Sequence, residues 1–128
     1  MQDKLTAVDE FHDTFKIGKA PSLPGLLGDN EYKLRFDLMK EENDEYLEAC
    51  QGNDLVEIAD ALGDQLYILC GTILKHGLQH KIEEVFDEIH RSNMSKLDDD
   101  GNPIFRADGK VLKGNGYFRP DIKGILNC

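Results

Sequence analysis

Residues 41–74 read EENDEYLEACQGNDLVEIADALGDQLYILCGTIL, and the fold is decided by this stretch. It contains nine acidic residues and no lysine or arginine. Surface helices usually mix both signs, because opposite charges four residues apart stabilise a helix and like charges do not. An acidic stretch of this length therefore predicts that cations are supplied from elsewhere.

The same region predicts two neighbouring helices. The first follows a cap at Asp29-Asn30 and stops at Gly52. It carries along one side Leu34, Leu38, Glu42, Glu45 and Ala49. The second is capped by Asn53 or Asp54 and extends to the stop at residues 76–77. Its broad apolar surface comprises Leu55, Ile58, Ala59, Leu62, Leu66, Leu69 and Ile73. Because the link is so short, we expect the two helices to be antiparallel.

Two more helices are predicted on either side of this pair. Apolar residues three and four positions apart (Leu5, Val8, Phe11 and Phe15) indicate a helix that ends near Gly18. Residues 20–30 contain Pro21, Pro24 and two glycines, so they predict a loop that borders a ligand site. A fourth helix is predicted over residues 79–96, with inward positions at Ile82, Val85, Phe86 and Ile89.

Helical periodicity ends after residue 96. The Asp108-Gly109 turn predicts a short β-hairpin between residues 104–106 and 110–112, followed by an extended tail. The fold prediction is therefore all-α, an antiparallel bundle of four to five helices over about residues 1–96. A basic tail covers about residues 97–128, and the whole chain of 128 residues is expected to be one domain.

Composition limits the partners. No apolar stretch reaches the roughly 20 residues that span a bilayer, so no membrane partner is expected. The net charge of -10 repels polyanions, so no nucleic-acid polymer is expected as a partner. Early acids such as Asp3 and Asp9 contradict a secretory signal, which predicts a cytoplasmic protein. Cys50, Cys70 and Cys128 are widely spaced, and we expect them to be reduced packing residues.

The acidic residues fall into a pattern typical of a metal site. Glu42 and Glu45 project from one helical face, with Glu41 beside Glu45 at i,i+4. On the next helix the corresponding carboxylates are Glu57, Asp60 and Asp64. Carboxylates this close raise one another's pKa unless a cation neutralises them. Ligation by oxygen alone suits Mg²⁺, with Mn²⁺ as a substitute.

These motifs resemble the all-α NTP pyrophosphohydrolase superfamily, which includes MazG-like proteins, dimeric dUTPases and phosphoribosyl-ATP pyrophosphohydrolases. The signature E-E-x-x-E followed by E-x-x-D is matched by Glu41, Glu42, Glu45, Glu57 and Asp60. The resemblance implies that Glu42, Glu45, Glu57 and Asp60 bind Mg²⁺ and that Glu41 assists as a ligand or a water-orienting base. Residues 89–96 and 108–113 are similar to a subgroup with a basic carboxy-terminal extension.

The resemblance implies hydrolysis of a nucleoside triphosphate between the α and β phosphates. It also implies a homodimer or homotetramer that completes the substrate pocket. On this reading Glu41, Glu42 and Glu45 are the catalytic group. The candidate substrate-binding residues are Asn93, Lys96, Lys110 and Lys113.

Two other classes of function stay open on the sequence alone. The bundle could bind metal or nucleotide without turnover, in which case no pyrophosphate would be released. It could also be an interaction module whose acidic face docks a basic partner and needs no magnesium. The base and sugar of the substrate are not specified by any motif.

Overall fold

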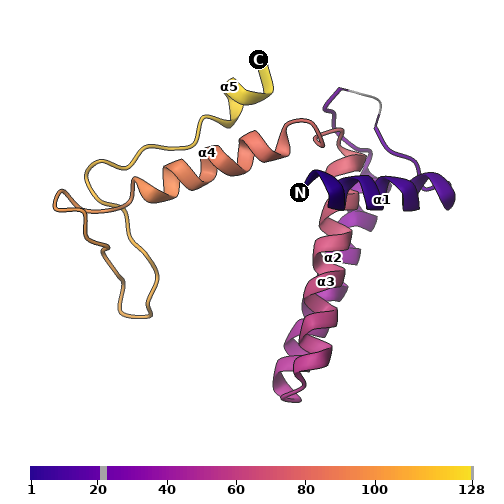
Figure 1. Cartoon of the computed structure of the whole chain (residues 1–128), viewed down its shortest axis with the longest axis horizontal. Helices are drawn as coiled ribbons and strands as arrows, with labels where there is room; N and C mark the ends of the chain where they lie inside the picture. Colours follow the sequence, from indigo (N-terminus) through magenta and orange to yellow (C-terminus); the bar gives the residue numbers. More distant parts are fainter. Residues whose placement is uncertain (21–22, 128) are drawn as a thin grey trace. The chain divides into compact units, whose positions relative to one another are not determined.

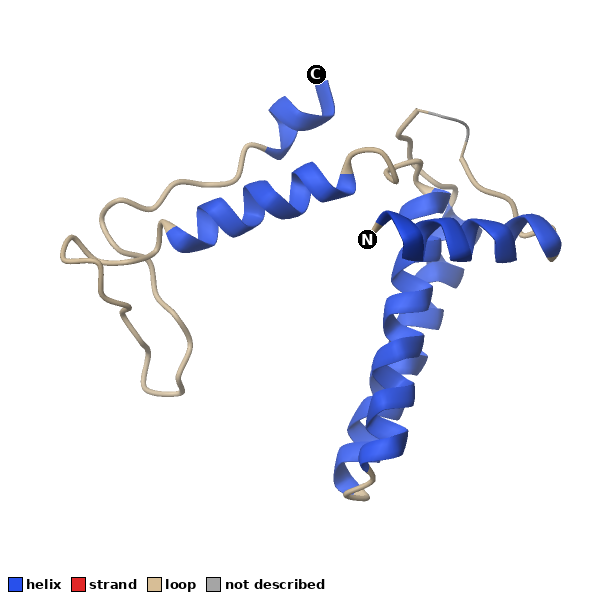
Figure 2. Ribbon diagram, viewed as in Figure 1, coloured by secondary structure: helices blue, strands red, loops and turns tan. Residues whose placement is uncertain are grey.

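The computed structural model describes residues 1–20 and 23–127, so Pro21 and Cys128 lie outside the described residues. The described part is all-α, as predicted, and contains helices but no β-strand (Figure 2). Within it, no helix is long and apolar enough to cross a membrane. The chain forms two compact units, Met1–His80 and Lys81–Cys128, and each is described by itself.

The first unit is built on an antiparallel helical hairpin. Helix α2 spans Asp29–Gln51 and α3 spans Leu55–Lys75, and the two run side by side (Figure 1). Asn53 adopts a left-handed conformation (φ 53°) in the three-residue link. Asp54 caps α3, because its side chain accepts hydrogen bonds from the backbone N–H groups of Val56 and Glu57. The predicted antiparallel pair is confirmed.

Helix α1, Gln2–Thr14, packs on α3 of the hairpin. Leu5 and Val8 are buried on its inner face, and Leu74 is their fully buried counterpart on α3. Phe11 meets the ring of Tyr67 edge-on, with ring centroids 5.5 Å apart. Burial of Leu5, Val8 and Leu74 stabilises this packing, since the hydrophobic effect scales with the apolar area removed from water.

Polar residues are also buried where α1, α2 and α3 meet. Arg35 donates from Nε to Thr72 Oγ1 and from Nη2 to the Ile68 carbonyl oxygen. His12 Nδ1 donates to the carbonyl oxygen of Gly18. Both side chains approach α3 closely at Gly71, where a Cβ atom would lie 2.6 Å from Arg35 Nη2. A glycine is therefore needed at this crossing.

The loop before α2 is anchored to the carboxy-terminal end of α3. The Ala20 N–H donates to the Leu74 carbonyl, and the Gly25 N–H donates to the His76 carbonyl. His76 Nδ1 donates in turn to the carbonyl oxygen of Gly25. Gly77 has a positive φ of 69°, and a Cβ there would lie 2.5 Å from the Leu23 carbonyl oxygen.

The second unit consists of α4, Ile82–Met94, and a long segment that returns along it to α5, Ile122–Asn127 (Figure 1). Ser92 Oγ donates to the Phe118 carbonyl oxygen, and the Phe118 N–H donates to Ser95 Oγ. Arg91 lies 4.4 Å from the centroid of the Phe118 ring and pairs with Glu88. These contacts tie the tail to one side of α4.

Three predictions for this part of the chain need correction. The predicted β-hairpin is not formed: Phe105 and Val111 make one isolated antiparallel bridge around the Asp108-Gly109 turn. A single bridge cannot build strands, which need a longer ladder of paired residues. Helix α4 begins at Ile82 and ends at Met94, inside the predicted range of 79–96. The tail, predicted to be extended, ends in the short helix α5.

Candidate metal centre

Three carboxylates converge between α2 and α3. Glu42 and Glu45 lie one turn apart on α2, and Asp64 reaches them from α3. One oxygen atom from each lies within 4.8 Å of the others. Oxygens at this spacing can share one cation, since divalent ions take carboxylate ligands at about 2.0–2.6 Å.

Glu42 is the most perturbed group in this cluster. Its Oε2 atom is buried and has no hydrogen-bond partner within the described residues. Desolvation, together with the neighbouring carboxylates of Glu45, Asp64 and Glu41, raises the pKa of Glu42 to about 7. An orphaned buried carboxylate oxygen among like charges is stabilised by a cation, so the residues present fit a hard divalent ion such as Mg²⁺.

The other predicted ligands lie beside this cluster. Glu57 and Asp60 line a depression of about 480 Å³ that also includes Glu45. Glu41 lines a second depression of about 370 Å³, again with Glu45. Glu45 therefore borders both depressions. The group of converging ligand atoms consists of Glu42, Glu45 and Asp64 and does not include Glu57 or Asp60. The candidate ligand roles of Glu57 and Asp60 stay predictions.

The predicted substrate-binding residues all belong to the second unit. Asn93 is exposed near the end of α4, and Lys96 follows the helix. Lys110 follows the Asp108-Gly109 turn, and the Nζ atom of Lys113 lies 4.7 Å from the centroid of the Tyr117 ring. Their role in binding phosphate stays a prediction.

The family of this chain is decided by a comparison with known proteins. Residues 8–93 match the family model described as phosphoribosyl-ATP pyrophosphohydrolase. The chain belongs to this family. The superfamily predicted from the carboxylate motifs is thereby confirmed. The matched range contains all three converging carboxylates, Glu42, Glu45 and Asp64, and ends before Lys96.

Two relatives of this family member illustrate the likeness. An uncharacterised protein of Acanthamoeba polyphaga mimivirus is 35% identical over 110 residues, which are 84% of this chain and 41% of that protein. The chain thus spans less than half the length of this curated relative. A crystal structure from Exiguobacterium sp. 255-15, provisionally named an NTP pyrophosphohydrolase, is 24% identical with a TM-score of 0.50. The superposition covers 94% of this chain and 90% of the Exiguobacterium chain. At this level of sequence identity it shows a shared fold alone.

Two side chains with shifted pKa values, His12 and Glu42, should change the free energy of unfolding with pH in opposite directions when no metal is bound. His12 is buried, and desolvation lowers its pKa below 6.5; the Gly18 carbonyl and Asp9 raise it, while Arg35 and Lys75 lower it. The stabilisation of the folded state by neutral His12 is present above pH 6.5, and it is lost as the pH falls through the pKa of His12 in the folded protein. Glu42, with its raised pKa, contributes stability that is lost as the pH rises from 4.5 to about 7.

When Glu42 is replaced by a residue that does not titrate, the pH dependence of the free energy of unfolding should follow the titration of His12. In Glu42→Gln protein, we expect the free energy of unfolding to decrease as the pH falls from about 7.5 to 5.5. Denaturant unfolding across this range measures the slope. Adding His12→Gln should flatten it, and a slope unchanged by that second substitution would contradict the assignment.

Proposed function

We propose that this protein is a Mg²⁺-dependent nucleoside triphosphate pyrophosphohydrolase. It hydrolyses the anhydride bond between the α and β phosphates and releases a nucleoside monophosphate and pyrophosphate. Its cellular role in this proposal is house-cleaning of the nucleotide pool. The observation that carries the proposal is the convergence of Glu42, Glu45 and Asp64 around a buried carboxylate oxygen without a partner. Membership of a pyrophosphohydrolase family supports it.

The proposed ligands of the cation are Glu42, Glu45 and Asp64, with Glu57 and Asp60 as further candidates. When bound, Mg²⁺ neutralises phosphate charge and makes a bound water more acidic. Mg²⁺ has six coordination positions, and carboxylates commonly fill only some of them, so the remaining positions would be open to water or to phosphate oxygens of the substrate. This explains how an acidic surface could accept an anionic substrate.

Glu41 is proposed to act on the attacking water. It is exposed on α2 and borders the same depression as Glu45, so it adjoins the proposed ligands without belonging to the converging group. A carboxylate beside the metal ligands can accept a proton from water or orient the water for attack. In this proposal Glu41 is the base, and the converging carboxylates of Glu42, Glu45 and Asp64 are the metal ligands.

Magnesium binding can be tested without any substrate. An ion that binds only the folded protein raises the melting temperature, so we expect Mg²⁺ at millimolar concentration to stabilise the protein. Asp64→Asn should abolish the shift, and the exposed Asp3→Asn, far from the site in sequence, is the matched control. No shift in the parent would favour an interaction module whose acids are solvated charge.

The proposed phosphate contacts predict a kinetic signature. Lys96→Ala, Lys110→Ala or Lys113→Ala should each raise KM or lower kcat by roughly 10-fold, because each removes a charge-assisted contact of about 1.5 kcal/mol. Asn93→Ala tests a contact with phosphate, sugar or base in the same assay. Lys4→Ala, a lysine of α1 paired with Asp3, serves as the control. Unchanged kinetics would remove the substituted residue from the binding site.

A further inference from the structure

Part of the second unit forms a loop whose two ends are held together. The Gly114 N–H donates to the Lys96 carbonyl oxygen over 2.8 Å, and these two residues mark the ends of the loop. The Tyr117 N–H donates to the Gly114 carbonyl oxygen over 3.2 Å, after which the chain returns along α4 (Figure 1). We call residues 95–97 and 113–115 the loop neck.

The loop neck leaves no room for a side chain at position 114. A Cβ atom on Gly114 would overlap the Leu97 carbonyl oxygen, and it would lie 2.8 Å from the Leu97 carbonyl carbon and 3.0 Å from the Lys96 carbonyl oxygen. These are backbone atoms, so relief of the clash would move the chain itself. Gly114 is not one of the glycines with a positive φ. It is therefore needed for the close approach of two backbone segments and not for an unusual conformation.

Two serines at the end of α4 fasten the returning chain to the loop neck. Ser92 Oγ donates to the Phe118 carbonyl oxygen over 2.8 Å, and Ser92 is only 2% exposed. Ser95 belongs to the loop neck, and its Oγ accepts a hydrogen bond from the Phe118 N–H over 3.2 Å and donates to the Ser92 carbonyl oxygen over 2.6 Å. Both backbone polar groups of Phe118 are thus paired. The returning chain is thereby fixed at Ser95, the residue next to Lys96.

The closed loop neck brings Lys96 and Lys113 together. Because Lys113 precedes Gly114, one backbone hydrogen bond links the two lysines, and their Cα atoms lie within about 8 Å of each other. Lys113 Nζ lies 4.7 Å from the centroid of the Tyr117 ring, which holds this side chain beside the loop neck. A cation–π contact leaves the ammonium N–H groups able to donate to an anion.

The acids that follow Lys96 are used in other contacts. Asp98 Oδ1 accepts hydrogen bonds from two backbone N–H groups of the loop, and Asp99 Oδ2 accepts one from Asn115 Nδ2 over 3.4 Å. Within the described residues, neither Lys96 nor Lys113 forms an ion pair with a carboxylate. Two lysines held together without a carboxylate between them favour the binding of an anion that carries several charges.

We propose that Gly114, Ser92 and Ser95 are positioning residues for substrate binding. They hold Lys96 and Lys113 at a fixed spacing, so that the two ammonium groups bind one linear oligophosphate together. This role rests on the proposed function, because the ligand is the β and γ phosphates of the nucleotide, which leave as pyrophosphate. Cations that are positioned in advance lose less conformational entropy on binding than two independent lysine side chains do.

Titration calorimetry of the full chain with inorganic tripolyphosphate and Mg²⁺ tests this role without hydrolysis of a nucleotide. The parent is expected to bind tripolyphosphate. Gly114→Ala should raise the dissociation constant by about 10-fold or more, because the added Cβ forces Lys96 and Lys113 out of their fixed spacing. Gly116→Ala is the matched control, since a Cβ at Gly116 would meet no atom within 4 Å. Its dissociation constant should stay within about twofold of the parent value.

A double-mutant cycle separates positioning from a general loss of structure. In the parent, Lys113→Ala should weaken tripolyphosphate binding by roughly 10-fold. In Gly114→Ala protein the same substitution should weaken binding by less than about threefold, because the lysines no longer act together. Ser92→Ala puts no new atom into the loop neck, and it should raise the dissociation constant by about threefold through the lost hydrogen bond to Phe118. Circular dichroism checks that each variant is helical.

Kinetics with a hydrolysed nucleotide give the matching signature. Gly114→Ala should raise KM by about 10-fold and change kcat by less than about twofold, since the proposed metal ligands belong to the first unit. Three results would each overturn the positioning role: a parent that does not bind tripolyphosphate, equal effects of Gly114→Ala and Gly116→Ala, or an undiminished effect of Lys113→Ala in Gly114→Ala protein. Failure of the proposed function gives a different result, in which no nucleotide is hydrolysed while tripolyphosphate binding still depends on Gly114.

Discussion

Asp64→Asn is expected to reduce Mg²⁺-dependent pyrophosphate release by on the order of 100-fold or more. Asp64 is the α3 residue whose oxygen lies within 4.8 Å of the ligand atoms of Glu42 and Glu45. The substitution keeps the shape of the side chain but removes one negative charge from the cluster. The rate of pyrophosphate release at saturating Mg²⁺ measures the loss, and circular dichroism confirms that the helix is intact.

Asp60→Asn is the informative comparison, because it lies one turn earlier on the same helix. Asp60 belongs to the E-x-x-D motif, yet it lines the neighbouring depression rather than the converging group. We therefore expect a smaller loss for Asp60→Asn, and likewise for Glu57→Gln, than for Asp64→Asn. If Asp64→Asn retained the parent rate while Asp60→Asn lost it, the metal centre would have to be assigned to the motif and not to Asp64.

Gly71→Ala is expected to destabilise the first unit by about 1–3 kcal/mol. Replacing glycine by alanine inside a helix normally stabilises by about 1 kcal/mol, so the expected sign is reversed here. The new Cβ would lie 2.6 Å from Arg35 Nη2 and 2.8 Å from His12 Nε2. Arg35 is buried and held by Thr72 and Ile68, and it cannot move without losing hydrogen bonds.

Gly63→Ala provides the control on the same helix. A Cβ at Gly63 would meet no atom within 4 Å, so we expect the ordinary stabilisation of about 0.5–1 kcal/mol. Denaturant unfolding followed by circular dichroism compares the two variants with the parent. Equal effects of the two substitutions would contradict the tight approach of α2 and α1 to Gly71.

The helical part of the fold could be predicted from the sequence because each helix carries its own local signals. Asp54 caps α3, and Gly52 closes α2, as expected from the polar and glycine residues in the link. The short helix α5 gave no such signal, since six residues are too few for a periodic pattern. The Asp108-Gly109 dipeptide did predict a turn, but flanking residues form one bridge only.

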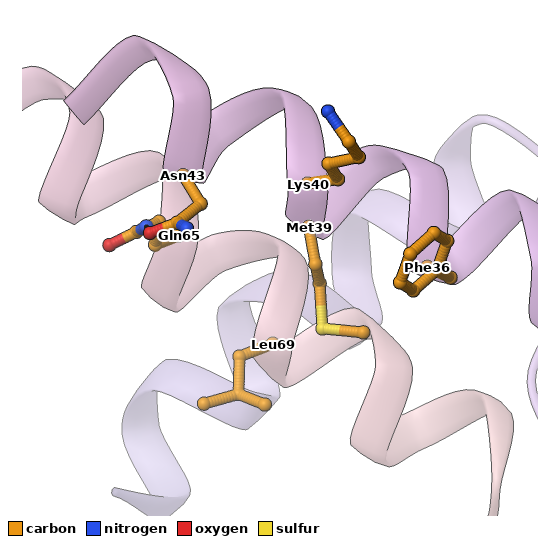
Figure 3. Close-up of a pocket in the computed structure, with 6 residues that line it drawn as sticks. All are labelled: Phe36, Met39, Lys40, Asn43, Gln65 and Leu69. Carbon is orange, nitrogen blue, oxygen red and sulfur yellow. Dashed lines mark hydrogen bonds between the residues drawn. The ribbon is translucent and has the colours of Figure 1, made fainter. Parts of the chain in front are cut away.

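The pairing of side chains across the hairpin followed from register, which motifs alone do not reveal. Glu42 and Asp64 lie eleven residues before and after Asn53, the left-handed residue of the link. In an antiparallel pair such residues face each other, and counting from the turn would have ranked Asp64 first. Asn43 and Gln65, the next residues along each helix, are joined by a hydrogen bond that the sequence analysis did not anticipate (Figure 3).

The buried polar cluster could not be predicted in the same way. His12 and Arg35 belong to different helices, and their approach at Gly71 depends on how α1 crosses the hairpin. A histidine beside Phe11 and an arginine in an amphipathic helix look like ordinary surface residues in the sequence. Only the tertiary arrangement shows that both are buried, at 2% and 6% exposure.

The most direct test of the central claim is product analysis with a panel of canonical and modified nucleoside triphosphates in the presence of Mg²⁺. Pyrophosphate and inorganic phosphate are quantified separately, and the Asp64→Asn protein is assayed beside the parent. We predict that the parent releases pyrophosphate and a nucleoside monophosphate from at least one member of the panel. Absence of cleavage with both Mg²⁺ and Mn²⁺, or release of inorganic phosphate alone, would contradict the proposed pyrophosphohydrolase activity.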